Sequence, residues 1–187
     1  IYRQPAVHLH ADWCVNRWGR VIVTLDAHKD MAMPPLPRLG IMLPVERSMR
    51  HVTYYGYGPD ESYIDKREHC YVDMFQAEVE DLHENYIRPQ ENGSHYHCRY
   101  VSLENEKYRL LAEADNYLDF NVSDYTVEEL AGKRHNFELE PASGSLLSLD
   151  ARMMGIGSNS CGPDLPEEFL RDEAHTVWKV QLQIEEL

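Results

Sequence analysis

Glutamates stand in the two most strongly patterned stretches of the chain. Glu61 belongs to residues 55–66, which combine three tyrosines, two glycines, one proline and three carboxylates. Glu91 stands directly before an Asn-Gly turn. Retaining glycoside hydrolysis needs two carboxyl groups about 5 Å apart, on either side of the sugar. We favour the other interpretation, in which both glutamates accept hydrogen bonds from turn backbones and from arginines such as Arg88 or Arg99.

Two His-x-His pairs are the metal-binding candidates of the sequence, because alternate residues of a strand share one face. His95 and His97 have Glu104 nearby, a grouping similar to one that cupins use, but the second cupin motif is not evident. His8 and His10 form the other pair, with less support. We expect all four to be surface or cleft histidines and the chain to hold no metal.

The charge balance of the chain restricts its partners. Its 187 residues include 32 acidic and 18 basic ones, giving a formal net charge of −14. We expect neither nucleic acid nor an anionic membrane as partner, because both require a positively charged protein surface. No apolar stretch is long enough to span a membrane, and no N-terminal secretion signal is evident. With 43% hydrophobic residues, the chain can bury the core of one domain.

The cysteines are widely spaced, at Cys14, Cys70, Cys98 and Cys161. No two are close enough in sequence for a C-x-x-C redox pair or a zinc knuckle. We therefore expect free thiols and a cytoplasmic location, because disulfides are rare in that reducing compartment.

Short strands are the main elements that must position these residues. Runs of β-branched and aromatic residues between turn signals predict strands at residues 21–25, 39–43, 51–57, 68–80, 95–103, 108–114, 117–122, 137–139, 145–149 and 176–184. A helix is the alternative for residues 68–80. One short helix is predicted where Thr126 and Glu129 form a capping box. The pattern predicts an all-β, antiparallel sandwich. In it, Trp178 of an alternating strand should pack in the core or on a sheet face, rather than join Trp13 and Trp18 in a sugar-stacking platform.

Four motifs, in order, resemble those of the C-terminal region of bacterial β-galactosidases of glycoside hydrolase family 2. The first is Tyr55-Gly56-x-Gly58-Pro59-x-Glu61-x-Tyr63-x-Asp65, similar to the family's Y-G-x-G-P-x-E-x-Y-x-D-R. The others are Pro37-Arg38-Leu39-Gly40, Tyr86-Ile87-Arg88-Pro89-Gln90-Glu91-Asn92-Gly93 and the glycine-rich residues 150–163, which resemble P-R-x-G, Y-x-x-P-Q-E-N-G and D-x-x-x-M-G-x-G. Together they cover almost the whole chain.

The resemblance implies a galactose mutarotase-like antiparallel supersandwich, the small-chain domain (domain 5) of those enzymes, of which residues 1–187 would form the later part. In the family the catalytic (β/α)8 barrel lies upstream, and a barrel alone takes about 250 residues. We therefore expect no barrel, no catalytic residue and no cofactor in this chain, with a divalent metal allowed in the catalytic portion. The complete enzyme would hydrolyse terminal β-D-galactosides with retention. The implied partners are the rest of the β-galactosidase (upstream barrel or large subunit) and the galactoside, with a homo-oligomer left open.

The resemblance also assigns roles to residues of the motifs. Architectural roles are implied for Tyr55, Gly56, Gly58, Pro59, Glu61, Tyr63, Asp65, Arg88, Pro89, Glu91, Asn92 and Gly93. A contribution to the galactoside pocket is implied for Ser158, Asn159, Ser160 and Cys161, with a plain surface connection as the alternative. Lys66 stands where the family has arginine, and it lacks the bidentate fork of arginine. Cys161 stands near a position where some relatives have a tryptophan that lines the pocket.

Two further functions stay open. A stand-alone carbohydrate-binding module would bind galactose or lactose by itself. A mutarotase-like epimerase would accelerate anomer interconversion, although no motif of the chain can be assigned to that chemistry. In the preferred hypothesis the chain alone is inactive, walls the galactoside pocket and packs against the catalytic portion through an exposed apolar patch.

Overall fold

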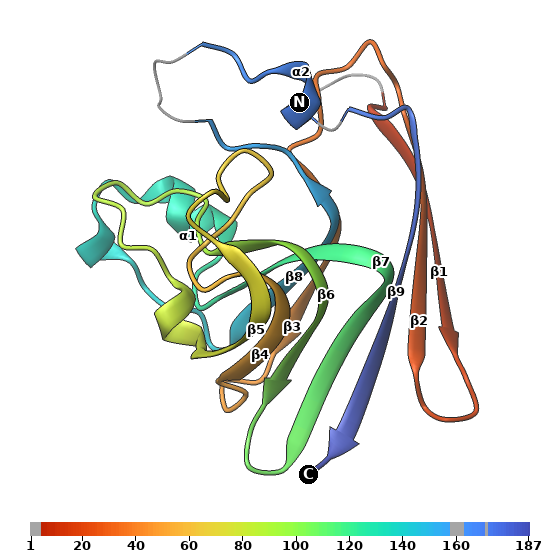
Figure 1. Ribbon diagram of the computed structural model, residues 1–187, viewed down its shortest axis with the longest axis vertical. Coiled ribbons are helices and arrows are strands. Elements are labelled where there is room, and N and C mark those ends of the chain that lie inside the picture. Colours follow the sequence, from red (N-terminus) through yellow and green to blue (C-terminus); the bar gives the residue numbers. More distant parts are fainter. Residues whose placement is uncertain (1–4, 158–162, 171) are drawn as a thin grey trace.

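The computed structural model describes residues 5–157, 163–170 and 172–187, which form one antiparallel β-sheet with a few short helices (Figure 1). Its nine strands are β1 (Val7–Val15), β2 (Val21–Lys29), β3 (Arg38–Val45), β4 (His51–Gly58), β5 (Tyr71–Glu78), β6 (Ser94–Glu104), β7 (Tyr108–Ser123), β8 (Ser145–Met153) and β9 (His175–Glu186). The helices in these ranges are α1 (Val127–Gly132), α2 (Glu167–Leu170) and the 3-10 segments η1 (Val79–Leu82) and η2 (Asn136–Glu138). None of them is long and apolar enough to cross a bilayer.

The long strand β7 is the centre of the sheet. Its first half pairs with β9 and its second half with β8, while β6 runs along its other side. The strand order is therefore β1-β2-β9-β7-β6-β4-β5, with β8 and then β3 branching from β7. In Figure 1, β1, β2 and β9 form an extended wing on the right, while the remaining strands curl around the centre. The sheet thus folds over itself in a sandwich-like way.

A kink beside Cys98 allows β6 and β7 to make this bend. The β6–β7 register shifts on both sides of Cys98, and His97 takes a positive φ of 58°, which is uncommon for a residue other than glycine. The Asp119 carboxylate holds the kink, because it accepts hydrogen bonds from the backbone N–H of His97 at 2.8 Å and of Met153 at 3.1 Å. Such irregularities bend and twist a strand, which lets both parts of the sheet face one core.

One hydrophobic cluster fills the space that the curled sheet encloses. Its members come from the wing and from the curled part alike, and include Val23, Leu25, Val52, Tyr54, Val101, Phe120, Leu147, Leu149, Trp178 and Val180. Along each strand these residues alternate with more exposed ones, as period-two geometry requires. Each fully buried side chain of this size contributes about 1.5–3 kcal/mol, so the core is the main source of stability. Trp178 packs here, as its place in an alternating strand predicted.

Most of the predicted elements are confirmed. Residues 68–80 contain the strand β5, and the capping-box segment is α1, where the Thr126 hydroxyl accepts a hydrogen bond from the backbone N–H of Glu129 at 3.1 Å. The all-β, antiparallel prediction is confirmed with them. The single-turn helix α2 is an addition that the sequence pattern did not predict.

Two strand predictions need correction. Residues 108–114 and 117–122 belong to one continuous strand, β7, because the exposed residues between them stay extended through the bend. The strand predicted at residues 137–139 is wrong, because these residues enter the 3-10 turn η2. The Glu138 carboxylate accepts hydrogen bonds from the backbone N–H groups of Arg134 and His135 at 3.0 and 2.9 Å. That local bonding favours a tight turn over an extended strand.

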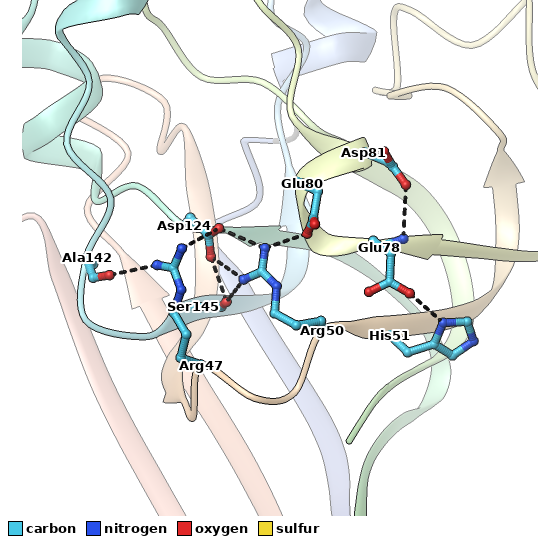
Figure 2. A network of polar contacts seen from close by, with 9 residues as sticks. All are labelled: Arg47, Arg50, His51, Glu78, Glu80, Asp81, Asp124, Ala142 and Ser145. Carbon is cyan, nitrogen blue, oxygen red and sulfur yellow. Dashed lines mark hydrogen bonds and ion pairs between the residues drawn. The ribbon is translucent and has the colours of Figure 1, made fainter. Parts of the chain in front are cut away.

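Arg50, in the loop between β3 and β4, joins the ends of several elements (Figure 2). Its guanidinium donates to both oxygens of Asp124 at 2.7 and 2.9 Å and to Glu80 of η1 at 2.6 Å. The Ser145 hydroxyl lies 3.0 Å from Arg50 and donates to Asp124 at 2.8 Å. Burial raises the pKa of Asp124, but the bonds from Arg50 and Ser145 outweigh it, so the pKa lies below its ordinary value of 3.8.

Replacing Arg50 by alanine should lower the free energy of unfolding by about 2 kcal/mol. The reason is that the Asp124 side chain, only 13% exposed, loses its charged partner. Arg50→Lys keeps the charge without the bidentate fork and should lose less. Urea unfolding measures both changes. Arg134→Ala, which removes an exposed side chain, is the control and should stay within about 0.5 kcal/mol of the parent.

The same variant gives a pH test. Because folding lowers the pKa of Asp124, its contribution to stability is complete above 3.8 and is lost as the pH falls through the folded-state pKa. The stability difference between the parent protein and Arg50→Ala should therefore shrink as the pH falls below about 4. Urea unfolding at a series of pH values measures it, and a difference that stays constant into strong acid would contradict this role of Asp124.

Candidate functional site

The four sequence motifs meet where four strand ends come together. Residues 37–40 begin β3, residues 55–66 end β4 and enter the next loop, residues 86–93 precede β6, and residues 150–157 end β8 and continue beyond it. The pairs β3–β8 and β4–β6 are antiparallel, so the start of one strand lies beside the end of its neighbour. The loops of all four motifs therefore share one region.

Glu61 links the first motif to the turn of the third. Its side chain is almost fully buried, and it accepts hydrogen bonds from the backbone N–H of Gly93 at 2.7 Å, from Lys66 Nζ and from the Tyr86 hydroxyl. Burial lowers the pKa of Lys66, but the bonds to Glu61 and Tyr86 outweigh it and the pKa is raised. Gly93 has a φ of 71°, and a Cβ there would lie 2.3 Å from the Leu82 carbonyl oxygen. Only glycine fits this turn.

Asp65 links the first motif to the fourth. Its two carboxylate oxygens accept hydrogen bonds from the backbone N–H groups of Ile156 at 3.1 Å and Gly157 at 2.8 Å. Gly155 packs directly on this carboxylate, since a Cβ there would lie 2.6 Å from Asp65 Cγ. The first glycine of the M-G-x-G sequence therefore provides the close approach that lets Asp65 hold the loop after β8.

Arg38 links the second, third and fourth motifs. Its guanidinium donates to both oxygens of Asp150, at 3.2 and 2.5 Å, and to Glu91 Oε2 at 3.3 Å. Burial raises the pKa of Asp150, which is 2% exposed, although the bonds from Arg38 oppose it. Burial also raises the pKa of Glu91. The sequence analysis expected an arginine such as Arg88 or Arg99 beside the glutamates. Arg38 takes this place at Glu91. Arg88 is exposed, and Arg99 donates to the Tyr117 hydroxyl at 2.9 Å.

A hollow of about 880 Å³ opens beside these linked loops. It is lined by Asp65, Lys66, Tyr86, Gln90, Ile156, Gly157, Pro163, Asp164, Leu165, Pro166 and Phe169. The predicted pocket residues Ser158, Asn159, Ser160 and Cys161 lie outside the described residues. The described residues on either side of that segment, Gly157 and Pro163, both line the hollow.

The other motif residues support the loops in different ways. Tyr63 is 2% exposed, and its hydroxyl accepts a hydrogen bond from Ser94 N–H at 3.4 Å. The Asn92 side chain accepts from Glu84 N–H at 3.0 Å and donates to the Gln90 carbonyl at 2.9 Å, which closes its turn. The peptide bond between Gly58 and Pro59 is cis.

The His95-x-His97 pair does not share one strand face. The expectation of a surface or cleft position is wrong for His95, which is 1% exposed and packs against the rings of Tyr54 and Phe120, with centroids 4.5 and 5.0 Å away. Burial lowers the pKa of His95 to about 4, so its ring is neutral at pH 7. His97 instead stacks on Tyr117 at 3.4 Å. The kink in β6 interrupts the period-two alternation on which the metal hypothesis for this pair depended.

Asp119 is a structurally important residue that the sequence analysis missed. It holds the β6 kink and also the backbone of Met153, from which the loop of the fourth motif departs. The available signal was a carboxylate between the apolar Leu118 and Phe120 of a predicted strand. A charge in such a place needs partners, but the sequence does not say which backbone groups supply them.

The fold and the site define the class of this chain: an all-β domain whose motif loops are cross-linked by carboxylates beside a hollow. The family model described as the β-galactosidase small chain matches residues 1–183. The chain therefore belongs to the β-galactosidase small-chain family.

Curated relatives named β-galactosidase are similar over most of this chain. The one from Actinobacillus pleuropneumoniae is 40% identical over 151 residues, which are 81% of this chain and 15% of that protein. The one from Staphylococcus xylosus is 38% identical over 179 residues, 96% of this chain and 18% of that protein. The one from Arthrobacter sp. (strain B7) is 34% identical over 167 residues, 86% and 16% respectively. The chain thus spans less than one fifth of the length of these relatives.

Replacing Asp65 by asparagine should loosen the loop after β8. An amide side chain has only one acceptor oxygen, so one of the N–H groups of Ile156 and Gly157 loses its partner. We expect amide hydrogen exchange at these two residues to become about tenfold faster, equivalent to the loss of one hydrogen bond. Asp60→Asn, at an exposed carboxylate of the same motif, is the matched control and should leave their exchange unchanged. Unchanged exchange in Asp65→Asn would contradict the role of Asp65.

Proposed function

We propose that this chain is a non-catalytic, C-terminal region of a β-galactosidase of glycoside hydrolase family 2, in which residues 1–187 form the later part of the small-chain β-sandwich domain. The observation that carries the proposal is the match of most of the chain to only 15–18% of enzymes named β-galactosidase. The remaining four fifths leave room for a (β/α)8 barrel of about 250 residues. Retaining hydrolysis of terminal β-D-galactosides belongs to that portion, together with any divalent metal the reaction needs.

The bonding of Glu61 and Glu91 supports a structural role for this chain. A catalytic carboxyl group must reach the substrate and exchange its proton or form a bond to the sugar. Glu61 is 4% exposed and is held by three donors, and Glu91 is paired with Arg38. The two carboxylates therefore fix loops, and in this proposal catalysis belongs to other residues of the enzyme.

The hollow beside the motif loops supports a contribution to the galactoside pocket. Gly157 and Pro163 line it, and Asp65 fixes the backbone directly before residues 158–162. A loop anchored in this way can present Ser158, Asn159, Ser160 and Cys161 to a pocket that the catalytic portion completes. In this proposal the chain walls the pocket and does not act on the sugar.

An exposed apolar surface on the wing supports packing against the rest of the enzyme. Leu9, Trp13 and Val15 of β1 are 53%, 55% and 68% exposed. They are paired with residues of β2 such as Val23 opposite Trp13, and therefore lie on the core-facing side of the sheet. Soluble monomers rarely expose a contiguous apolar surface of this kind. We propose that the remaining portion of the β-galactosidase covers it.

The purified chain should not hydrolyse a chromogenic β-galactoside above the buffer background. We expect Glu61→Gln to be indistinguishable from the parent chain in this assay, because Glu61 bonds protein groups and not substrate. A complete β-galactosidase is the positive control. Turnover by the chain that Glu61→Gln abolishes would overturn the proposed non-catalytic role.

Replacing Trp13 by aspartate should weaken the association of the chain with the rest of the enzyme at least about tenfold, because it places a charge on the apolar surface of β1. Surface plasmon resonance with the separately produced remainder of the enzyme measures the affinity. Cys14→Asp is the matched control, since it places the same charge one residue away on the opposite face of the strand. Equal losses in both variants would argue against this surface as the contact.

A carbohydrate-binding module is a second candidate, because half-exposed rings of Tyr96, His97 and Tyr117 adjoin one another on β6 and β7. Aromatic faces of this kind can stack on sugars. Guanidinium groups already lie over them, with Arg67 5.0 Å from the Tyr96 ring and Arg99 4.2 Å from the Tyr117 ring. Calorimetry with lactose separates the candidates, since affinity of the chain alone would favour the binding module.

A further inference from the structure

A cluster of one aspartate and two histidines lies on the wing, away from the motif loops. Asp26 and His28 belong to β2, and His175 is the residue of β9 directly opposite His28. Asp26 Oδ1 lies 3.2 Å from His28 Nε2 and 2.8 Å from His175 Nε2. The three potential ligand atoms all lie within 4.8 Å of one another. Residues 147 positions apart in the sequence thus direct their metal-binding atoms to one point.

The strand register explains why these groups converge. Residues two apart on a strand share a face, so Asp26 and His28 point to the same side of β2, and directly paired residues of neighbouring strands share that side. The adjacent residues Leu25 and Ala27 are buried on the other side. His175 therefore meets His28 on the outer face of the wing, and their rings stack with centroids 4.1 Å apart and planes 8° from parallel.

We propose that Asp26, His28 and His175 bind a divalent transition-metal ion of the Zn²⁺ type. Neutral imidazole and carboxylate are ligands that such ions prefer, at about 2.0–2.2 Å. In a tetrahedral site these bond lengths place ligand atoms about 3.3 Å apart, close to the two aspartate–histidine separations in the structure. The side chains are 44%, 61% and 50% exposed, so the stacked rings can rotate by the small amount needed to admit the ion.

The neighbouring strand supplies two further histidines to the same face. His8 is directly opposite His28, and His10 is directly opposite Asp26. Three protein ligands leave one position of a tetrahedral ion open, and either His8, His10 or a water molecule can fill it. The site lies on β1, β2 and β9, the side-by-side strands of the wing in Figure 1. A bound ion would cross-link β2 to β9, two neighbouring strands of the wing.

This proposal departs from the expectation that the chain holds no metal. That expectation considered only histidine pairs within one strand, such as His95 and His97. The cluster at Asp26 joins two strands that the sequence separates by most of its length, so no local spacing could indicate it. Among the residues that the structure describes, Asp26, His28 and His175 form the group of His, Cys, Asp or Glu side chains with at least three potential ligand atoms within 4.8 Å of one another.

Isothermal titration calorimetry of ZnCl2 into the purified protein, free of any histidine tag, tests the proposal. We expect one ion per chain, with the affinity at least tenfold weaker in both Asp26→Asn and His175→Ala. The three side chains are 44–61% exposed and lie on the outer face of the wing, so neither substitution removes packing from the core. His69→Ala is the matched control, because His69 is an exposed histidine outside the cluster, and it should bind Zn²⁺ like the parent.

Cobalt substitution gives an independent measurement. Co²⁺ in the site should show visible absorption bands from tetrahedral nitrogen and oxygen ligands, and His175→Ala should lose them. Absence of one-to-one Zn²⁺ binding would overturn the proposal. An affinity that is unchanged in either Asp26→Asn or His175→Ala, or reduced equally by His69→Ala, would overturn it as well, because the cluster would then not be the site.

Discussion

Three carboxylates, two of them buried, hold the loops of this domain together. Asp150, Glu61 and Asp65 each bond a group from a different motif, through Arg38, Gly93 and the backbone after β8 respectively. A buried charge that loses its partner costs about 3–5 kcal/mol, so the loops held by Asp150 and Glu61 cannot move away independently. This requirement explains why the motifs combine acidic residues with glycines, since the glycines let backbone approach the carboxylates closely.

The bend in β6 and β7 places the motif loops relative to the hydrophobic core. Without the kink at His97, the two halves of β7 would continue one flat sheet, and the strands of the motifs would not curl back over the core residues of the wing. Asp119 holds the kink and the backbone of Met153 at once. The same carboxylate thus shapes the sheet and sets the point from which the loop toward the hollow departs.

On the three strands of the wing, period-two alternation places apolar side chains on one face and the Asp26, His28 and His175 cluster on the other. On one face, Leu9, Trp13 and Val15 extend the apolar core surface beyond the part that the domain itself covers. On the other face, Asp26, His28 and His175 gather polar ligand groups. Packing against a larger enzyme and binding of an ion can therefore coexist here, because each uses only its own side of the sheet.

The family, the all-β class and most strands follow from the sequence alone, because long alternating runs leave one face for a core and the motif spacing is distinctive. The sequence also pointed to glycine turns such as Gly93, where only one residue type fits. Which groups meet depends on the folded chain. Arg38 and Lys66, and not Arg88 or Arg99, pair with Glu91 and Glu61. His175 joins Asp26 and His28. These contacts connect residues far apart in the chain. They follow from strand order, register and one kink, which local side-chain patterns do not encode.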